Sequence, residues 1–250
     1  ESLKNVKVAY LCVGLPYRVG VWQEQWPVII ENVIRACSEG AVNLVFFDNI
    51  YMFHPQEVGN LTESSRKDPH SAKGKLRYQI LNKLWDAHNR GQIKFCVARS
   101  ADFYGPGVGA VSLINEGLIK PLKAGKKANW FGKTNITHHF TYVPDAAKAT
   151  AMLGNSEKAW GQEWNLPTDQ REWTAEQYVE FLARELKQSP RKQVANGFIL
   201  SVLGLFNPTL KEFKEMLYQY EQPYRFRSAK FEREFQVSAT PYEQGLKSCL

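Results

Sequence analysis

The chain has 250 residues, of which 44% are hydrophobic and 23% charged, and its 32 basic and 25 acidic side chains leave a formal charge of +7. These values are typical of a soluble globular protein with one large domain, or one domain and an appendage. The basic residues are spread along the chain without interleaved aromatics, so no nucleic-acid-binding module is evident; they suit a solvated surface or a field that attracts an anionic ligand.

The first elements predicted along the chain are two strands joined by a helix. Residues 6–13 and 42–47 are continuous apolar runs of β-branched and aromatic residues, which is typical of parallel strands buried on both faces. Between them, residues 22–38 carry apolar side chains at helical spacing. The order predicts a strand–helix–strand unit with a right-handed crossover.

A second helix and a third strand extend this unit. The helix is predicted over residues 71–88, Gly91 ends it, and residues 93–98 form another buried apolar run. The order β-α-β-α-β predicts the second half of a doubly wound, Rossmann-like α/β fold with a parallel sheet.

After residue 98 the pattern changes to short helices and irregular segments. Helices are predicted at 111–119, at 144–153, from a capping box at Thr174 to residue 187, from Asn207-Pro208 onward, and from residue 240. We therefore predict two parts. Residues 1–110 form the second half of a Rossmann-like dinucleotide-binding domain, and residues 111–250 form mainly a smaller α-rich substrate subdomain, with some segments returning to the sheet.

The cysteines and the most apolar segment of the chain indicate in which cellular compartment the protein lies. Cys12, Cys37, Cys96 and Cys249 form no C-x-x-C pair, which indicates buried free thiols in a reducing cytoplasm. The most apolar segment, 194–206, is too short to span a bilayer. We expect a cytoplasmic protein without a membrane anchor.

Several segments, in order and over essentially the whole chain, resemble the extended short-chain dehydrogenase/reductase family of the NAD-dependent epimerase/dehydratase type. The segments that carry the resemblance are 32–37, Ile50-Tyr51, 99–107, 142–149 and 239–246. The resemblance implies a Rossmann-like fold, NAD or NADP as cofactor, and a small-molecule, sugar-like substrate. It leaves the formation of a homodimer open.

In that family a glycine-rich βαβαβ segment binds the cofactor's pyrophosphate, and we expect such a segment ahead of residue 6. The resemblance places the backbone of Gly14, Leu15 and Pro16 beside the cofactor, although a strand-ending turn explains these residues equally. It also places Asp48 and Ala101 near the cofactor.

The catalytic positions depart from the family pattern. The family uses a Ser or Thr together with Y-x-x-x-K on one helix, where the lysine lowers the pKa of the tyrosine. Here Phe47 occupies the serine position, Lys73 the tyrosine position and Arg77 the lysine position. Lys73 and Arg77 could hold an anion between them; a solvated helix face is the alternative.

Other residues are candidates for the acid and for substrate contact. Tyr51 is the phenol that we favour as the acid, and Asn49, Asp102 and Tyr104 are predicted substrate contacts. Two alternatives stay open, because Asn49 could cap the turn after its strand and Asp102 could form a salt bridge with Arg99.

The adjacent residues His138 and His139 could in principle be ligands of a metal ion. No Cys, Asp or Glu accompanies it at ligand spacing, and a surface-exposed strand explains it, so we predict no metal site.

Three functional hypotheses follow. The first is an NAD(P)-dependent oxidoreductase or epimerase with a non-standard proton relay. The second is a catalytically inactive sensor that binds a dinucleotide. The third is an enzyme of this fold whose chemistry does not use the Tyr/Lys pair.

Overall fold

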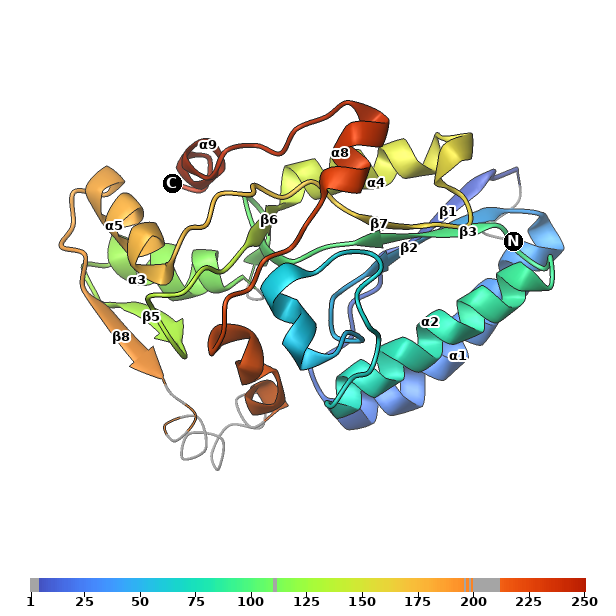
Figure 1. The fold of residues 1–250 in the computed structure, drawn as a ribbon, viewed down its shortest axis with the longest axis horizontal. Coiled ribbons are helices and arrows are strands. Elements are labelled where there is room, and N and C mark those ends of the chain that lie inside the picture. Colours follow the sequence, from blue (N-terminus) through green and yellow to red (C-terminus); the bar gives the residue numbers. More distant parts are fainter. Residues whose placement is uncertain (1–4, 110–111, 196, 198, 200–211) are drawn as a thin grey trace.

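The computed structural model describes residues 5–109, 112–195, 197, 199 and 212–250. Its main sheet consists of β1 (Val8–Leu11), β2 (Asn43–Asp48), β3 (Phe95–Arg99) and β7 (Glu163–Asn165), in the order β1-β2-β3-β7 (Figure 1). All neighbouring strands in it are parallel. The predicted α/β class with a Rossmann-like parallel sheet is confirmed.

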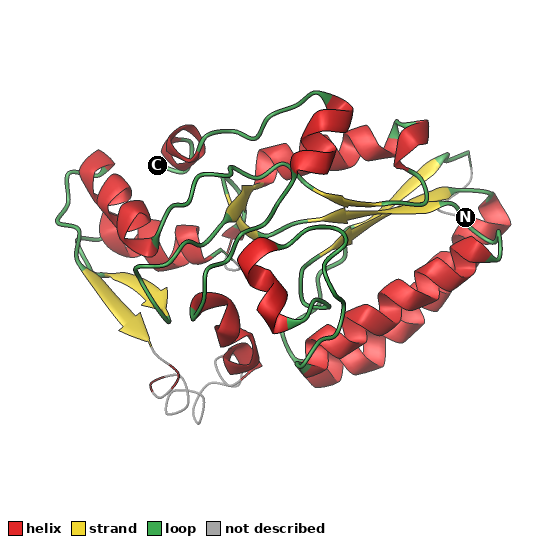
Figure 2. Ribbon diagram, viewed as in Figure 1, coloured by secondary structure: helices red, strands yellow, loops and turns green. Residues whose placement is uncertain are grey.

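Helices cover both faces of this sheet (Figure 2). They are α1 (Val19–Gly40) and α2 (Ala72–Asn89) on one face, and α4 (Val143–Gly154) and α8 (Ala229–Phe235) on the other. Successive residues of β2 point to opposite faces, so Leu44 and Phe46 enter the core under α1 and α2, whereas Val45 packs with Ala146 and Phe231. The sheet is thus the middle layer of three.

A further cluster of buried side chains lies beyond the sheet, at the end of the molecule away from β1 (Figure 1). The strands here are β4 (Asp102–Tyr104) paired with β6 (Phe140–Tyr142), and β5 (Ala128–Phe131) paired with β8 (Lys192–Ala195). We call this cluster the second core. Trp130, Tyr178 and Tyr242 are among its largest buried side chains.

The remaining described elements are short. The 3₁₀ helices are η1 (Pro55–Asn60), η4 (Glu157–Ala159) and η5 (Lys214–Tyr220), and η3 (Leu113–Ile119) is a π-helix. The α-helices are α3 (Lys120–Lys123), α5 (Ala175–Glu185) and α9 (Tyr242–Lys247). The predicted capping box is present, because Thr174 and Gln177 bond to each other's backbone amides at the start of α5. The helix start predicted at Asn207-Pro208 lies outside the described residues, as does most of 194–206.

The strand predicted over residues 6–13 differs from the structure. β1 is shorter, and within the described residues it lies at the edge of the sheet, with Tyr10 43% exposed. Burial on both faces stays a prediction for this strand. The prediction of a buried thiol is wrong for Cys12, which is exposed, whereas Cys37 and Cys96 are buried free thiols as predicted. No helix among the described residues is long and apolar enough to cross a membrane.

One extended segment, residues 224–227, connects the sheet region with the second core. The amide of Arg225 donates to the carbonyl of Val58 at 2.8 Å, and the amide of Tyr224 donates to the carbonyl of Thr137 at 2.8 Å. Because it bonds to both regions, this connecting segment brings the tyrosines near its start to the edge of the sheet.

Candidate functional site

The candidate site lies at the carboxyl ends of the parallel strands. Tyr17 follows β1, Tyr51 follows β2, and Asp102 follows β3 at the start of β4. In doubly wound folds, ligands bind at this edge of the sheet because the loops after parallel strands meet there.

The charge of Asp102 acts on five tyrosine phenols, of which Tyr220 alone among the described residues bonds to its carboxylate. They belong to Tyr17, Tyr51, Tyr218, Tyr220 and Tyr224. Burial raises the pKa of each phenol above its ordinary value, and the negative charge of Asp102 raises it further. These phenols therefore stay protonated at neutral pH and act as neutral hydrogen-bonding groups.

Asp102 is anchored through one of its two carboxylate oxygens. Oδ2 accepts a hydrogen bond from the Tyr220 hydroxyl at 2.7 Å and lies 3.1 Å from His138 Nε2. The side chain of Asp102 is 28% exposed, whereas that of His138 is 1% exposed. The carboxylate is thus the part of this group that a small molecule can reach.

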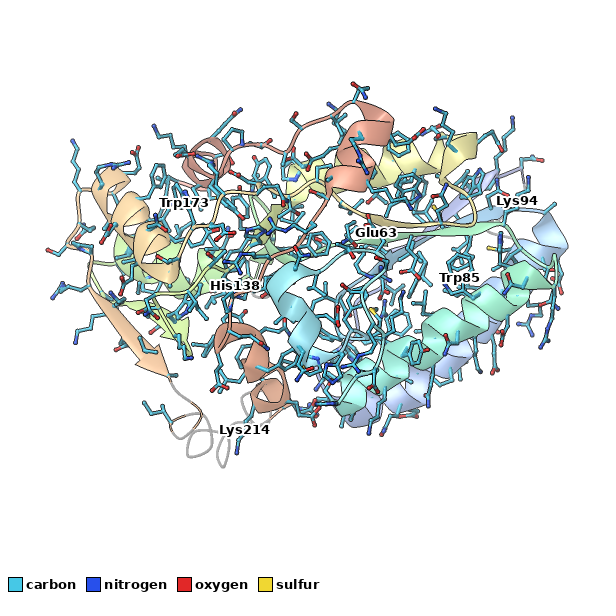
Figure 3. The ribbon with its side chains drawn as sticks, in the orientation of Figure 1. Glu63, Trp85, Lys94, His138, Trp173 and Lys214 are labelled. Atoms are coloured by element: carbon cyan, nitrogen blue, oxygen red, sulfur yellow. The ribbon has the colours of Figure 1, made fainter. Side chains whose placement is uncertain are left out.

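His138 is enclosed by aromatic rings. It stacks between Tyr220 and Tyr224, with ring centroids 4.4 and 4.5 Å away, and Trp130 meets it edge-on. Figure 3 labels it left of the centre, on the side of the molecule where the second core lies. Packing on both ring faces fixes the imidazole plane, and with it the direction of the bond to Asp102.

Arg77 is a buried cation with its own carboxylate. Its Nε donates to Asp48 Oδ1 at 2.9 Å, and its guanidinium group lies 4.7 Å from the centroids of the Trp26 and Phe46 rings. The side chain is 4% exposed, so the interpretation of this position as a solvated helix face is wrong.

Lys73 is likewise buried and paired. Its ammonium group bonds to the Glu212 carboxylate and lies 4.2 Å from the centroid of the Tyr17 ring. Its side chain is 1% exposed, so it is not a solvated residue either. The two cations, one helical turn apart, coexist because each faces a different carboxylate.

Asp48 belongs to a chain of buried ion pairs that ties strand ends together. Arg99 lies 3.4 Å from Asp48 Oδ2 and 2.7 Å from Glu163 Oε2. Burial opposes ionisation of Glu163, but Arg99 and Lys67 hold the pKa of this carboxyl below its usual range. The predicted alternative of a salt bridge between Arg99 and Asp102 is wrong, because Arg99 turns to Asp48 and Glu163.

The other two predicted substrate contacts, Asn49 and Tyr104, lie in different parts of the structure. Asn49 Oδ1 accepts from the amide of Tyr51 at 3.0 Å, so this side chain shapes the turn after β2. Tyr104 is 1% exposed and packs against Tyr142 and Tyr242 in the second core, where burial raises the pKa of its phenol.

The residues predicted beside a cofactor adopt ordinary loop geometry. A Cβ on Gly14 would meet open space, Leu15 is half-buried against the core, and the Pro16 carbonyl accepts from Trp22 Nε1 at 2.9 Å. This contact helps to start α1. The amide of Ala101 donates to Thr141 Oγ1 at 3.2 Å.

His139 faces a different environment from its neighbour. It is fully buried, its Nδ1 accepts from the Phe226 amide at 3.2 Å, and burial lowers its pKa to about 4. The expected surface-exposed strand is therefore wrong for both histidines. Within the ranges that the structure describes, no group of three or more His, Cys, Asp or Glu could hold a metal ion.

Sequence reasoning missed Tyr17, His138 as a partner of Asp102, Tyr220 and Tyr224. A signal was present, because three tyrosines stand close together at Tyr218, Tyr220 and Tyr224. Only the return of this segment to the sheet shows that they face Asp102.

Comparison with solved structures defines the fold class. The chain has the fold of NAD-dependent epimerases and dehydratases, as the resemblance predicted. A UDP-glucuronic acid 4-epimerase from Bacillus cereus, solved with NAD, matches with a TM-score of 0.77 and 16% identity over 98% of this chain and 73% of the other.

Two further structures agree. A dTDP-glucose 4,6-dehydratase from Bacillus anthracis, solved with NAD, has a TM-score of 0.75 and 17% identity over 98% of this chain and 71% of its own. An epimerase from Methanothermobacter thermautotrophicus has a TM-score of 0.78 and 11% identity over 97% and 70%. No protein-family model and no curated protein matches the sequence. At these identities the likeness establishes the fold.

Proposed function

We propose that the protein is an NAD(P)-dependent oxidoreductase or epimerase that acts on a small, sugar-like molecule with a non-standard proton relay. The observation that carries the proposal is Asp102, a reachable carboxylate that accepts a hydrogen bond from the neutral phenol of Tyr220 at the carboxyl ends of the strands. The fold adds support, because similar structures of sugar-nucleotide epimerases and dehydratases were solved with NAD.

The described residues suit the uncharged end of a nicotinamide dinucleotide. The buried hydroxyl of Tyr17 lies near that of Tyr51, and the buried hydroxyl of Tyr224 lies near the backbone of Asp102. Neither makes a hydrogen bond of ordinary geometry with the described residues, so a polar, uncharged group could satisfy them. We propose that the nicotinamide and its ribose lie there, near the backbone of Ala101 and of residues 14–16. When bound, this group accepts or returns a hydride.

The diphosphate requires other partners. Three described cations beside this site, Lys73, Arg77 and Arg99, are each bound to carboxylates of the chain itself. We propose that residues 111–250 chiefly enclose the substrate.

A catalytically inactive dinucleotide sensor is the second candidate. It is favoured by the state of the family's catalytic positions, because Lys73 and Arg77 are neutralised by Glu212 and Asp48. The phenol of Tyr51 has a raised pKa, which does not suit a base at neutral pH.

Two measurements separate the candidates. The first is a fluorescence titration with NADH and NADPH. The second is turnover of UDP-glucose, UDP-glucuronic acid and dTDP-glucose with NAD or NADP. Binding together with turnover supports the enzyme, binding without turnover supports the sensor, and no binding at millimolar concentration refutes both.

A further inference from the structure

Asp102 offers one free carboxylate oxygen. Both of its side-chain hydrogen bonds, to Tyr220 and His138, use Oδ2, and Oδ1 accepts none from the described residues. Since the side chain is 28% exposed, Oδ1 is the oxygen available to a ligand.

The bonding pattern defines the proton position on His138. A carboxylate oxygen lies 3.1 Å from Nε2, while Nδ1 is buried and has no partner among the described residues. A buried N–H without an acceptor is costly, so the ring proton sits on Nε2 and is donated to Asp102. Two donors thus hold Oδ2 and leave Oδ1 to meet a substrate.

The other acidic and phenolic groups around the site are engaged or protonated. The five phenols keep their protons because burial raises their pKa. Glu212 accepts from the Val19 amide at 2.8 Å and binds Lys73, Glu215 accepts from the Ala72 amide at 3.1 Å, and Asp48 binds arginines. Asp102 and Glu215 each keep one oxygen without a donor among the described residues, but Glu215 is exposed beside the start of α2. Asp102 is the one of the two that His138 and Tyr220 hold at the strand ends.

We propose that Asp102 is the proton acceptor of the reaction and that His138 and Tyr220 are its positioning residues; this rests on the function proposed above. Oδ1 accepts a hydrogen bond from a hydroxyl on an uncharged, hydroxyl-bearing part of the substrate. The proton released as the substrate O–H bond breaks passes to Oδ1. A bound nicotinamide dinucleotide would take the hydride from the neighbouring C–H bond, so that the carbon–oxygen bond becomes a carbonyl. In the reverse direction Asp102 returns the proton.

The substrate class follows from the charges at the site. A phosphate or carboxylate on the reacting end would meet the negative Asp102, and the described cations Lys73 and Arg77 are already paired with other carboxylates. A polyol or sugar ring instead supplies hydroxyl donors to Oδ1.

The principal test is Asp102→Asn, which keeps the shape and removes the base. With the sugar-nucleotide panel above, we expect kcat to fall by at least about 100-fold, the range of general-base catalysis. The NADH dissociation constant should stay within about twofold, and Asp102→Glu should restore part of the rate. Asp68→Asn, an exposed aspartate on the loop before α2, is the matched control and should keep wild-type turnover.

A second test examines the positioning residues. Tyr220→Phe removes one hydroxyl and keeps the ring, so we expect a lower kcat with an unchanged KM. Nitrogen NMR of the histidine side chains is independent of activity, and it should show His138 protonated on Nε2 alone in wild type. In Asp102→Asn this tautomer preference should weaken.

The outcomes are distinguishable. If wild type turns over a sugar nucleotide and Asp102→Asn keeps more than about half of its rate, the inference fails and the proposed function stands. If wild type binds NADH but turns over none of the panel, the proposed enzyme fails and the inference fails with it. A wild-type His138 proton on Nδ1 overturns the inference whatever the activity.

Discussion

At the scale of single residues, the adjacent histidines show how neighbouring positions in an extended chain acquire different roles. His138 points to Asp102 and the tyrosine rings, whereas His139 points to the backbone of Phe226. Both are buried, but only His138 has a carboxylate partner. The two histidines, whose adjacency suggested a metal site in the sequence, therefore lie in two separate environments.

The lowered pKa of His139 predicts that the folded protein loses stability in acid. Because burial lowers its pKa from 6.5 to about 4 in the folded state, its contribution is fully present above pH 6.5 and is lost as the pH falls toward 4. Between pH 7 and pH 5 we expect it to lower the free energy of unfolding by about 2 kcal/mol. Urea unfolding at the two pH values measures this difference.

The control variants isolate the residue. His139→Gln should reduce the difference between the two pH values by that amount, while His70→Gln, on an exposed loop, should leave it unchanged. An equal pH dependence in wild type and His139→Gln would contradict the assignment.

At the scale of elements, the buried ion pairs join the ends of strands to a helix. Asp48 at the end of β2 binds Arg77 of α2 and Arg99 of β3, and Arg99 binds Glu163 of β7. The pairs cross three strands, from the carboxyl ends of β2 and β3 to the first residue of β7. Their geometry therefore sets where the loops carrying Tyr51 and Asp102 begin.

Asp48→Asn is predicted to destabilise the fold strongly. Removing the charge leaves two buried guanidinium groups without a shared carboxylate, and breaking a buried pair costs about 3–5 kcal/mol. Chemical denaturation of the purified variant measures the loss. Glu31→Gln, which breaks the exposed pair with Lys83, should cost much less; equal losses in the two variants would refute the prediction.

At the scale of the whole molecule, the connecting segment 224–227 unites the sheet region and the second core. Its backbone bonds to Val58 on one side and to Thr137 on the other. It also positions Tyr224, so the site depends on the way these two regions are held together.

Arg225→Pro should weaken this connection. Proline removes the amide that donates to the Val58 carbonyl, and leaving a buried backbone group unpaired costs about 1–3 kcal/mol. Hydrogen exchange followed by mass spectrometry should show faster exchange around residues 58–61 and 137–139. Arg225→Ala keeps the amide and loses only the partly exposed pair with Glu172, so its exchange should match wild type; faster exchange in both variants would contradict the role of the amide.

The periodic parts of the fold could be predicted from the sequence. Apolar runs mark β2 and β3, helical spacing marks α1 and α2, and the Thr174 capping box marks α5. These signals are local, because each reflects side-chain spacing or a backbone amide within a few residues. Of the site, the sequence predicted Asp102 and Tyr51 at strand ends, where parallel topology alone brings loops together.

Only the tertiary structure decided which partners these side chains have. Lys73 and Arg77 resemble a solvated pair along the helix, yet they are buried because Glu212 and Asp48, distant in sequence, compensate their charges. Likewise, His138 meets Asp102 through the pairing of β4 with β6. The sequence by itself determined the α/β architecture and the edge of the sheet where the site lies, since both follow from local periodicity. The assembly of the site around Asp102 depends on long-range packing that no local pattern encodes.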